Sequence, residues 1–450
     1  MTADRAFWLF VAFAALVFLM GGGSRFDIES TGPLRAIAAL FLAAGLWFQS
    51  GEQLRSIAVP LGLLVALAIW MALQLVPLPP SIWQSLAGRE DIVAAGQLLG
   101  MDGQSRPLTF SPLRTMNSLA ALVVPLTALV LLSLLDCQGL RRLRTGVVIV
   151  GVTSAILGAA QIILPGSEGL YFYEITNGDS AVGLFSNRNH NALFLSIALI
   201  FSLFQSGSKG RRGWDEKTIW IAAARLVLVA GILITSSRFG LGMLGLIGLV
   251  YGVHLLLALR RSGKEVTLMQ KLAGAGAAVA AAGMIALFAL LGRIPALERL
   301  SGFYEGGLAE GQRTDTLPYV LQMAADHFPF GVGFGAFEQA YRTIEPETLL
   351  NPRYLNHAHN DWVQLVIEGG LPGVLVFLIG ALWLLRMAWR AIRARQAAGE
   401  SLAAPLLGLL TLGAIVLHSA VDYPLRTPSI MLLAAFAIVL VSRAAQDARS

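Results

Sequence analysis

Long apolar stretches recur from one end of the chain to the other, and short polar segments separate them. Many of these stretches reach about 18 residues or more, which is the length that an α-helix needs to cross a bilayer. The pattern predicts an all-α, polytopic membrane protein with about 12 transmembrane helices. We place these helices near residues 7–20, 34–49, 56–76, 117–135, 146–164, 190–205, 219–235, 239–258, 270–292, 363–386, 401–418 and 428–443.

The composition agrees with this fold class. Of the 450 residues, 56% are hydrophobic and 13% are charged, and the mean hydropathy is +0.68. Soluble domains carry roughly a quarter of charged residues. We therefore expect residues 1–450 to form a single integral membrane domain. The one cysteine, Cys137, excludes an internal disulfide and a cysteine-based zinc cluster.

The distribution of charge predicts the orientation of the chain. One set of connecting segments, which includes both ends, holds 19 of the 33 basic residues and eight of the 27 acidic residues. The other set holds 13 basic and 19 acidic residues. Because cytoplasmic loops are rich in Lys and Arg, we expect both termini to be cytoplasmic. The formal charge of +6 then reflects topology and anionic lipid headgroups rather than a nucleic-acid partner.

The largest segment on the opposite face covers residues 293–361, between the ninth and tenth predicted helices. A loop of this length usually serves as a lid or a binding surface. Within it, residues Thr316 to His327 have an amphipathic pattern that predicts a short helix.

Three glycines follow that predicted helix, namely Gly331, Gly333 and Gly335. They superficially resemble a dinucleotide-binding loop, but that motif requires a strand before it and a helix after it. We interpret them instead as a tight connection after a helix that ends near Phe328.

Arginines lie at the ends of predicted helices on this same face. Arg188 lies two residues before the span 190–205, and Arg238 lies in a short turn between two spans. Either side chain could simply extend to the lipid headgroups. Yet this face is depleted in positive charge, and ionisable residues near membrane depth are functional candidates. Two neighbours of Arg188 are further candidates for substrate binding, Asn189 and His190.

Two more arginines are candidates for substrate binding, and each has a structural alternative. Arg313 lies in the large loop, where it could form a salt bridge with Glu310 or Asp315. Arg426 lies in a short turn between the last two predicted helices, where a pair with Asp422 could hold the turn closed.

The strongest candidate for catalysis lies in the stretch from Asn356 to Gly373. There, His359 and Asn360 directly precede a strongly apolar helix, and either Asn360 or Asp361 is suited to cap it. The positive end of the helix dipole favours a neutral imidazole. A neutral imidazole can accept a proton from a hydroxyl group, so His359 is a candidate general base. His357 and Asn360 beside it are candidates for substrate binding.

Two alternatives apply to this stretch. His357 and His359 could bind a metal, but zinc sites usually need three or four protein ligands. The other histidines that we place on this face are His190, His327 and His418. The second alternative is a purely structural histidine beside the helix cap. We expect neither a metal nor a cofactor.

Arginines facing one poised histidine suit a particular class of substrate. Glycans linked to undecaprenyl pyrophosphate are displayed on the outer leaflet of the bacterial cytoplasmic membrane. Arginine guanidinium groups suit their diphosphate, because they can bind phosphate oxygens through two parallel hydrogen bonds. Displacing this leaving group also requires a base for the incoming sugar hydroxyl. The expected substrates are therefore a lipid-linked glycan and an acceptor sugar.

The sequence resembles the O-antigen ligase and polymerase superfamily at these residues. The ligase pattern is His, then Asn, Ser or Gln, nine residues, Gly, two residues, and Gly, Thr or Tyr. Here it is met by His359, Asn360, Gly370 and Gly373. The segments TSSRFG and FSNRNHNA are similar to two arginine signatures of the superfamily. The resemblance is best from about residue 180 to residue 373.

The resemblance implies a membrane glycosyltransferase that uses polyprenol-linked donors, similar to the GT-C class. It implies an inverting, metal-independent transfer in which Arg188 and Arg238 bind the pyrophosphate and His359 is the base. The site would face the periplasm from the inner membrane. The acceptor is lipid A-core for a ligase, or another lipid-linked repeat for an O-antigen or exopolysaccharide polymerase.

A transporter or flippase is the rival of another class. It would also place charged groups between helices, but transporters usually show inverted repeats and broken helices near the midplane. The polar candidates of this chain gather on one face instead. We therefore favour the enzyme.

Overall fold

The computed structural model describes residues 1–101, 103–164, 166–205, 209–210, 213–261, 308–350 and 355–447. The predicted span 270–292 lies outside the described residues, and so do 293–307 and 351–354 of the predicted large loop. Each of the other predicted spans falls on a helix. The expectation of an all-α architecture is therefore confirmed for the part of the chain that is described.

Six helical segments of the described chain are long and apolar enough to cross a membrane. They are Ala3–Met20, Pro112–Ser133, Cys137–Ile163, Glu216–Ile234, Asp361–Ala397 and Pro428–Gln446. Four shorter apolar helices accompany them, Thr31–Trp47, Ala58–Leu73, Arg238–Val253 and Ala403–His418. The chain is thus a multi-pass membrane protein, whereas the total of 12 spans stays a prediction.

The chain divides into two compact units, 1–139 with 306–450, and 140–305. The elements of unit 1 are α1 (Ala3–Met20), α2 (Thr31–Trp47), α3 (Gly51–Ser56), α4 (Ala58–Leu73), β1 (Pro77–Leu78), α5 (Pro80–Trp83), α6 (Glu90–Leu98), β2 (Arg106–Pro107), α7 (Pro112–Ala121), α8 (Val123–Ser133), α15 (Leu308–Asp326), α16 (Phe337–Tyr341), η2 (Glu347–Leu349), α17 (Asp361–Ala397), α18 (Ala403–His418), η3 (Pro424–Arg426) and α19 (Pro428–Asp447). Those of unit 2 are α9 (Cys137–Ile163), which begins at the boundary, η1 (Ser167–Leu170), α10 (Arg188–Leu203), β3 (Lys209–Gly210), β4 (Gly213–Trp214), α11 (Glu216–Ile234) and α12 (Arg238–Arg261).

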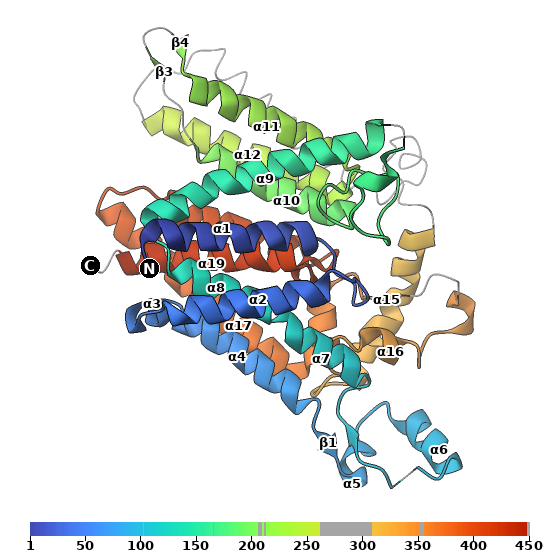
Figure 1. Ribbon diagram of the computed structural model, residues 1–450. Coiled ribbons are helices and arrows are strands. Elements are labelled where there is room, and N and C mark those ends of the chain that lie inside the picture. The colour runs from blue at the N-terminus through green and yellow to red at the C-terminus, as the bar shows by residue number, and fades with distance from the viewer. Residues whose placement is uncertain are drawn as a thin grey trace. The chain divides into compact units, whose positions relative to one another are not determined.

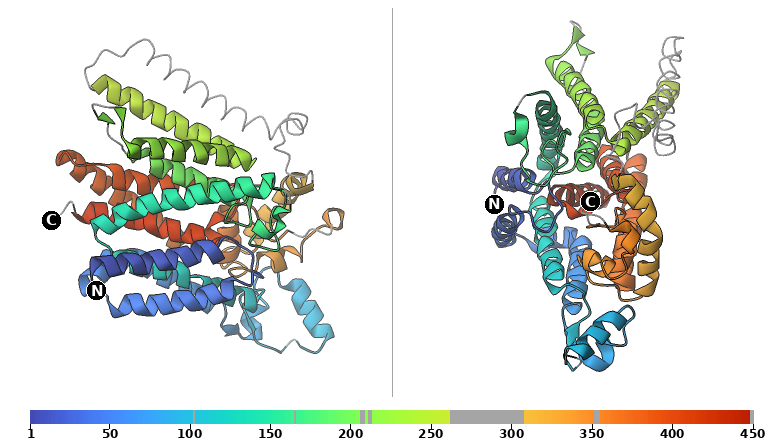
Figure 2. Two further views of the ribbon diagram at one scale, coloured as in Figure 1. Left: turned by 45° about the horizontal axis from the view of Figure 1, so that its top comes forward. Right: turned by 90° about the vertical axis from the view of Figure 1, so that its right-hand side faces the viewer.

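Unit 1 is a helix bundle built around α19. This helix packs against α1, α8, α17 and α18, and it is the most buried of the candidate spans. Ser429, in its first turn, donates a hydrogen bond from its hydroxyl to the carbonyls of Val17 and Gly21 at 3.0 and 2.9 Å. Figure 1 shows α1, α2, α8 and α19 running side by side, with α15 and α16 at one end of this bundle and both termini at the other. The further views show the red C-terminal helices beside the blue N-terminal ones (Figure 2).

Helix α15 lies in the predicted large loop and has the predicted amphipathic pattern. Its buried residues Thr316, Val320 and Met323 recur at helical spacing, and His327 continues the same face. Val320 and Met323 pack into a core together with the glycine-rich segment, α16 and α17, through Val332, Ala336, Phe337, Tyr341 and Ile367. The loop is therefore folded onto the bundle over these residues.

Residues 77–111 form a small substructure that is anchored to the end of α15. Strand β1 pairs antiparallel with β2. Arg89 is buried, lies 3.9 Å from the ring centre of Phe110 and donates to the carbonyl of Leu108. Burial and the charge of Arg106 lower the pKa of Arg89 to about 10. His327 packs edge-on against the same Phe110 ring, with the two ring centroids 5.3 Å apart.

The feature that positions the site is a break in α17 at Gly370. This residue has φ 58° and ψ −158°, a conformation that is almost restricted to glycine. Pro372 follows two residues later and has no N–H to donate back to the carbonyl of Glu368. The helix therefore consists of two helical parts that meet at Gly370.

The backbone groups freed by this break all have partners. Leu371 donates to the carbonyl of Pro329 at 2.8 Å instead of to Ile367. The carbonyl of Ile367 accepts from the N–H of Val332 at 2.7 Å, and that of Glu368 accepts from the N–H of Gly333 at 3.1 Å. A free backbone group in an apolar environment costs several kcal/mol, so these bonds are what permits the break.

Two further side chains bind backbone groups near the break, namely Trp70 of α4 and Gln74, which directly follows α4. Gln74 donates to the carbonyl of Glu368 at 2.9 Å and accepts from the N–H of Phe334 at 3.1 Å. The indole N–H of Trp70 donates to the carbonyl of Gly369 at 2.8 Å. The glycines predicted to form a tight connection do so, because Gly331, Gly333 and Gly335 all have positive φ beside α17 and α7.

Unit 2 is organised around α9, α10, α11 and α12. Gln161 of α9 binds both backbone groups of Gly183, at 2.8 and 3.1 Å, and thereby holds the segment before α10 against α9. Asn191, in the first turn of α10, is fully buried between Ser154 and the carbonyl of Ala181. The start of α10 is therefore fixed on two sides.

We predict that Gly370→Ala destabilises the protein. A Cβ at this position would collide with the carbonyl of Pro329, and the backbone conformation alone costs a non-glycine residue about 1–3 kcal/mol. The midpoint of thermal unfolding in detergent should fall by several degrees. Gly413→Ala in α18 is the matched control, since it has open space beside it and favours helix. Equal midpoints for the two variants would contradict the prediction.

Candidate functional site

The imidazole of His359 lies beside a buried carboxylate. Its Nδ1 is 3.6 Å from Oδ1 of Asp422, whose side chain is 1% exposed, whereas the His359 side chain is 18% exposed. The carboxylate also accepts from the N–H of Tyr423 at 3.0 Å, which fixes its position. Because Nδ1 faces Asp422, Nε2 is the atom of the ring that can meet an incoming hydroxyl. The separation of 3.6 Å is longer than a hydrogen bond, and catalytic contacts often shorten only when substrate binds.

The backbone around His359 is held in an uncommon conformation. His359 has φ 49°, in the left-handed region, and directly precedes the cap of α17. Asn360 is that cap, because its Oδ1 accepts from the N–H groups of Trp362 and Val363 at 3.0 and 3.2 Å. The predicted capping role of Asn360 is thus confirmed, and its side-chain oxygen is already engaged by the backbone.

His357 lies next to His359 but has different partners. The rings of His357 and His359 both pack against Tyr423, with centroids at 4.3 and 5.1 Å. Nδ1 of His357 is 3.1 Å from the amide nitrogen of Gln364. Burial and the positive charge of Arg426 lower the pKa of His357 well below its usual value. His357 therefore stays neutral near pH 7, with Nδ1 accepting from the amide.

A chain of buried polar groups continues along α17 from His357. Gln364 also donates to Oε1 of Glu368 at 2.8 Å, and Glu368 is fully buried. Its second oxygen, Oε2, accepts from Nη2 of Arg426 at 3.0 Å. The guanidinium of Arg426 in turn lies 3.4 Å from Oδ1 of Asp361. These contacts join the start of α17 to the turn that carries Asp422.

The partners of Arg426 are therefore two carboxylates of α17, Asp361 and Glu368. The expected alternative was a pair between Arg426 and Asp422, but Asp422 lies beside His359 and, at 4.0 Å, His418. Proximity to the carboxylates raises the pKa of Arg426, so the guanidinium stays charged. Contact of Arg426 with substrate stays a prediction, and the structure gives the residue a bridging role between α17 and the turn before α19.

Arg188 and Arg238 lie in unit 2 and occupy equivalent positions. Each is the first residue of its helix, α10 and α12 respectively. The backbone N–H of Arg188 donates to Asn177 at 3.0 Å, and that of Asn189 donates to the cap residue Asn187 at 2.8 Å. Because the side chains of Asn177 and Asn187 already bind the first amides of α10, an anion at this helix start would have to be held by the guanidinium of Arg188.

One hydroxyl group links the starts of these two helices. Ser237 accepts from the N–H of Gly240 at 3.2 Å, which caps α12, and donates to Oδ1 of Asn189 at 2.8 Å. Gly240 also lies against Ala192 of α10, so the two backbones are close. Arg188 and Arg238 therefore lie at two adjacent helix N-termini, each of which carries the positive end of a helix dipole.

The remaining predicted residues are placed as follows. His190 is fully buried at the start of α10. Arg313 lies on α15, and its side chain is outside what the structure describes. The first cluster, with His357, His359, Asn360 and Arg426, belongs to unit 1, and the arginine cluster of α10 and α12 belongs to unit 2.

The described residues contain no group of three or more His, Cys, Asp and Glu side chains that could hold a metal ion. His357 and His359 share the face of Tyr423, and each faces a different partner, Gln364 and Asp422. The polar groups of this cluster are thus arranged for proton acceptance and ion pairing.

Residues 222–378 match the family model described as O-antigen ligase. The matched segment comprises 157 of the 450 residues, from 222 through 378, and contains Arg238, Arg313, His359 and Asn360. No curated protein matches the chain. Members of this family are glycosyltransferase-like ligases and polymerases, so the match supports an enzyme that acts on lipid-linked glycans.

The structure adds residues to this candidate site that the sequence pattern did not single out for it. Asp422 lies outside the matched segment, yet it is the carboxylate beside His359. Gln364 and Glu368 follow Asn360 at intervals of four residues, and both are fully buried. That spacing of polar residues on an apolar helix was the available signal, since it places them on one face.

We predict that Arg426→Gln destabilises the protein, because it leaves Glu368 buried without its cation. Removing one partner of a buried pair typically costs about 3 kcal/mol or more. The midpoint of thermal unfolding should fall clearly, and adding Glu368→Gln should restore part of the loss. Arg342→Gln is the control, because the side chain of Arg342 is 55% exposed in its pair with Glu338. Exposed pairs contribute about 0.5 kcal/mol. A double variant no more stable than Arg426→Gln would refute the bridging role.

Proposed function

We propose that the chain transfers a glycan from undecaprenyl pyrophosphate to a sugar hydroxyl of lipid A-core, as an O-antigen ligase. The observation that carries this proposal is His359 beside the buried Asp422, at the start of α17 and within the matched family segment. A neutral imidazole whose Nδ1 faces a carboxylate is arranged to accept a proton at Nε2. The positioning of the ring by Asp422 favours a catalytic over a purely structural histidine.

The proposed step is a single displacement at the anomeric carbon of the donor glycan. The acceptor oxygen forms a bond to this carbon and releases its proton to Nε2 of His359. The bond from the anomeric carbon to the pyrophosphate oxygen breaks, and that oxygen takes the electron pair. Attack from the face opposite the leaving group inverts the configuration of the sugar.

Arg188 and Arg238 are proposed to stabilise the pyrophosphate as it leaves. Two guanidinium groups can offer planar forks to its oxygens, and charge developing on the leaving group strengthens such contacts in the transition state. Their starting positions are fixed relative to each other through Ser237 and Asn189. The proposal requires this cluster to face His359 in the active enzyme.

The proposed location is the periplasmic face of the bacterial inner membrane, with both termini cytoplasmic. This orientation is supported by the excess of Lys and Arg in the segments that include the chain ends. In unit 1, the start of α1 and the end of α19 lie at the end of the bundle opposite α15 and α16 (Figure 1). The histidine cluster follows α16 in the chain, at the start of α17.

The acceptor distinguishes the ligase from a polymerase that uses the same chemistry. A ligase transfers the glycan to lipid A-core, whereas a polymerase transfers it to another lipid-linked repeat. Purified protein supplied with the lipid-linked donor and each acceptor separately would decide between them. We expect product with lipid A-core. If product formed only with the lipid-linked repeat, the chain would be a polymerase and not a ligase.

We predict that His359→Ala lowers the rate of transfer by about 10²–10⁴-fold, the range for loss of a general base. Asp422→Asn should lower the rate less, because the imidazole remains but its orienting carboxylate is lost. Single-turnover assays with purified protein would measure both rates. Donor binding should change little in either variant, because the base acts on the acceptor.

Thermal unfolding of the same preparations separates catalysis from folding. A structural histidine would lose donor binding and stability together with activity. Normal unfolding and donor binding in the inactive His359→Ala variant would therefore support the assignment. Transfer by that variant at near the wild-type rate would show that another group is the base.

We predict that Arg188→Lys and Arg238→Lys each reduce turnover substantially, although the charge is kept. Lysine offers a point charge in place of the planar fork, so it cannot make the same paired contacts to phosphate oxygens. Alanine at either position should reduce turnover further. Arg55→Lys, at an exposed position of α3, is the control and should transfer normally. Wild-type turnover in both lysine variants would argue against bidentate binding of the pyrophosphate.

A further inference from the structure

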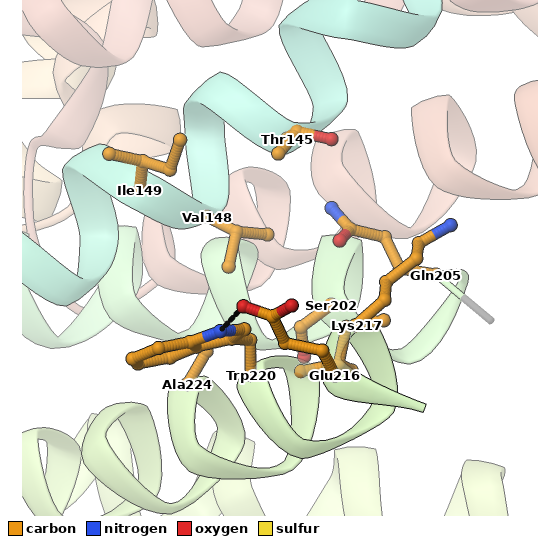
Figure 3. Close-up of a pocket in the computed structure, with 10 residues that line it drawn as sticks. Thr145, Val148, Ile149, Ser202, Gln205, Glu216, Lys217, Trp220 and Ala224 are labelled. Atoms are coloured by element: carbon orange, nitrogen blue, oxygen red, sulfur yellow. Dashed lines mark hydrogen bonds between the residues drawn. The ribbon is translucent and has the colours of Figure 1, made fainter. Parts of the chain in front are cut away.

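Unit 2 contains a groove at the end of α10 that is far from Arg188. Its volume is about 450 Å³, which is within the range of small-molecule sites. Helices α9, α10 and α11 contribute the side chains that line it (Figure 3). Ser202 lies 14 residues after Arg188 on α10, so the groove is roughly 20 Å from the proposed pyrophosphate site. It is therefore a separate feature of the molecule.

The groove has a polar end and an apolar floor. Glu216 and Lys217, in the first turn of α11, form the polar end with Gln205, and the floor is made of Val148, Ile149, Trp220, Ile221 and Ala224. The part of α11 from Glu216 to Ala224 is about 12 Å long. Helices α9 and α11 are both candidate membrane spans. The groove thus runs from the headgroup level into the acyl region of a bilayer.

The exposed residues of the floor agree with contact to lipid. Ile149 is 60% exposed and Trp220 is 67% exposed, on helices that would otherwise present these side chains to water. Trp220 also donates from its indole N–H to Oε1 of Glu216 at 3.2 Å, as Figure 3 shows. An apolar ring with its N–H directed to the polar end is the usual arrangement of tryptophan at a membrane interface.

The polar end offers charges of both signs side by side. Lys217 is exposed, and Glu216 keeps its second carboxylate oxygen available beside the indole bond. The end of α10 would repel a phosphate through its carbonyls, but Arg225 donates to the carbonyls of Ser202 and Gln205 at 2.7 and 3.2 Å. The combination suits a headgroup that carries both a phosphate and an ammonium.

We propose that this groove binds a phospholipid with a phosphoethanolamine headgroup. The phosphate lies at Lys217, the ammonium donates to the carboxylate of Glu216, and one acyl chain covers Val148, Ile149 and Ile221. A primary ammonium donates hydrogen bonds, whereas the quaternary ammonium of phosphatidylcholine does not. The site should therefore discriminate between these two zwitterionic lipids.

The test measures lipid retained by the full-length protein after delipidation in detergent, by native mass spectrometry. Dioleoyl phosphatidylethanolamine, phosphatidylcholine and phosphatidylglycerol are added separately at equal concentration. We expect one phosphatidylethanolamine per chain, bound about three- to fivefold better than phosphatidylcholine, as expected for one exposed charged contact. Glu216→Gln should remove this preference, and Lys217→Ala should weaken binding of both lipids.

Glu52→Gln and Arg55→Ala in α3 are the matched controls, since both residues are exposed and lie in unit 1. They should leave the preference unchanged, and thermal unfolding of every variant verifies folding. Equal binding of phosphatidylethanolamine and phosphatidylcholine by the wild type would indicate annular lipid only and overturn the proposal. Stronger binding of phosphatidylglycerol, lost in Lys217→Ala alone, would overturn it in favour of an anionic lipid.

Discussion

The break in α17 at Gly370 is the constraint on which the rest of unit 1 depends. A membrane-embedded chain must give every backbone donor and acceptor a partner, so a helix can break only where other segments replace the lost bonds. Here the glycine-rich segment and α4 supply them, through Val332, Gly333, Trp70 and Gln74. The break in turn sets the direction of the first part of α17, which carries the polar cluster at its start.

The polar groups on this part of α17 form a continuous set rather than separate contacts. His357, Gln364, Glu368 and Arg426 are connected in sequence, and Tyr423 supports both histidine rings. A buried network of this kind is stable only if each member is satisfied. The surroundings of His359 consequently depend on several buried groups beyond its own neighbour Asp422.

The sequence predicted those features that follow from local pattern. The helices were predictable because each must bury an apolar run, and the cap at Asn360 because its side chain bonds within three residues. The partners of Arg426 were not predictable, since Glu368 is 58 positions away and the sequence pointed to the nearby Asp422 instead. The hydroxyl of Ser237 meets Asn189 across 48 positions. Such contacts depend on how helices pack, which local pattern does not encode.

The bonds between α4 and the break in α17 also bear on how the protein is made. Gln74 and Trp70 are separated from their acceptors by 294 and 299 positions. During synthesis, α4 therefore leaves the ribosome long before the carbonyls of Glu368 and Gly369 exist. Its amide and indole must rely on temporary partners, such as water or interfacial groups, until most of the chain has followed. Because of this order of translation, the bundle can close only late in synthesis, through the same residues that hold the break before the polar cluster in place.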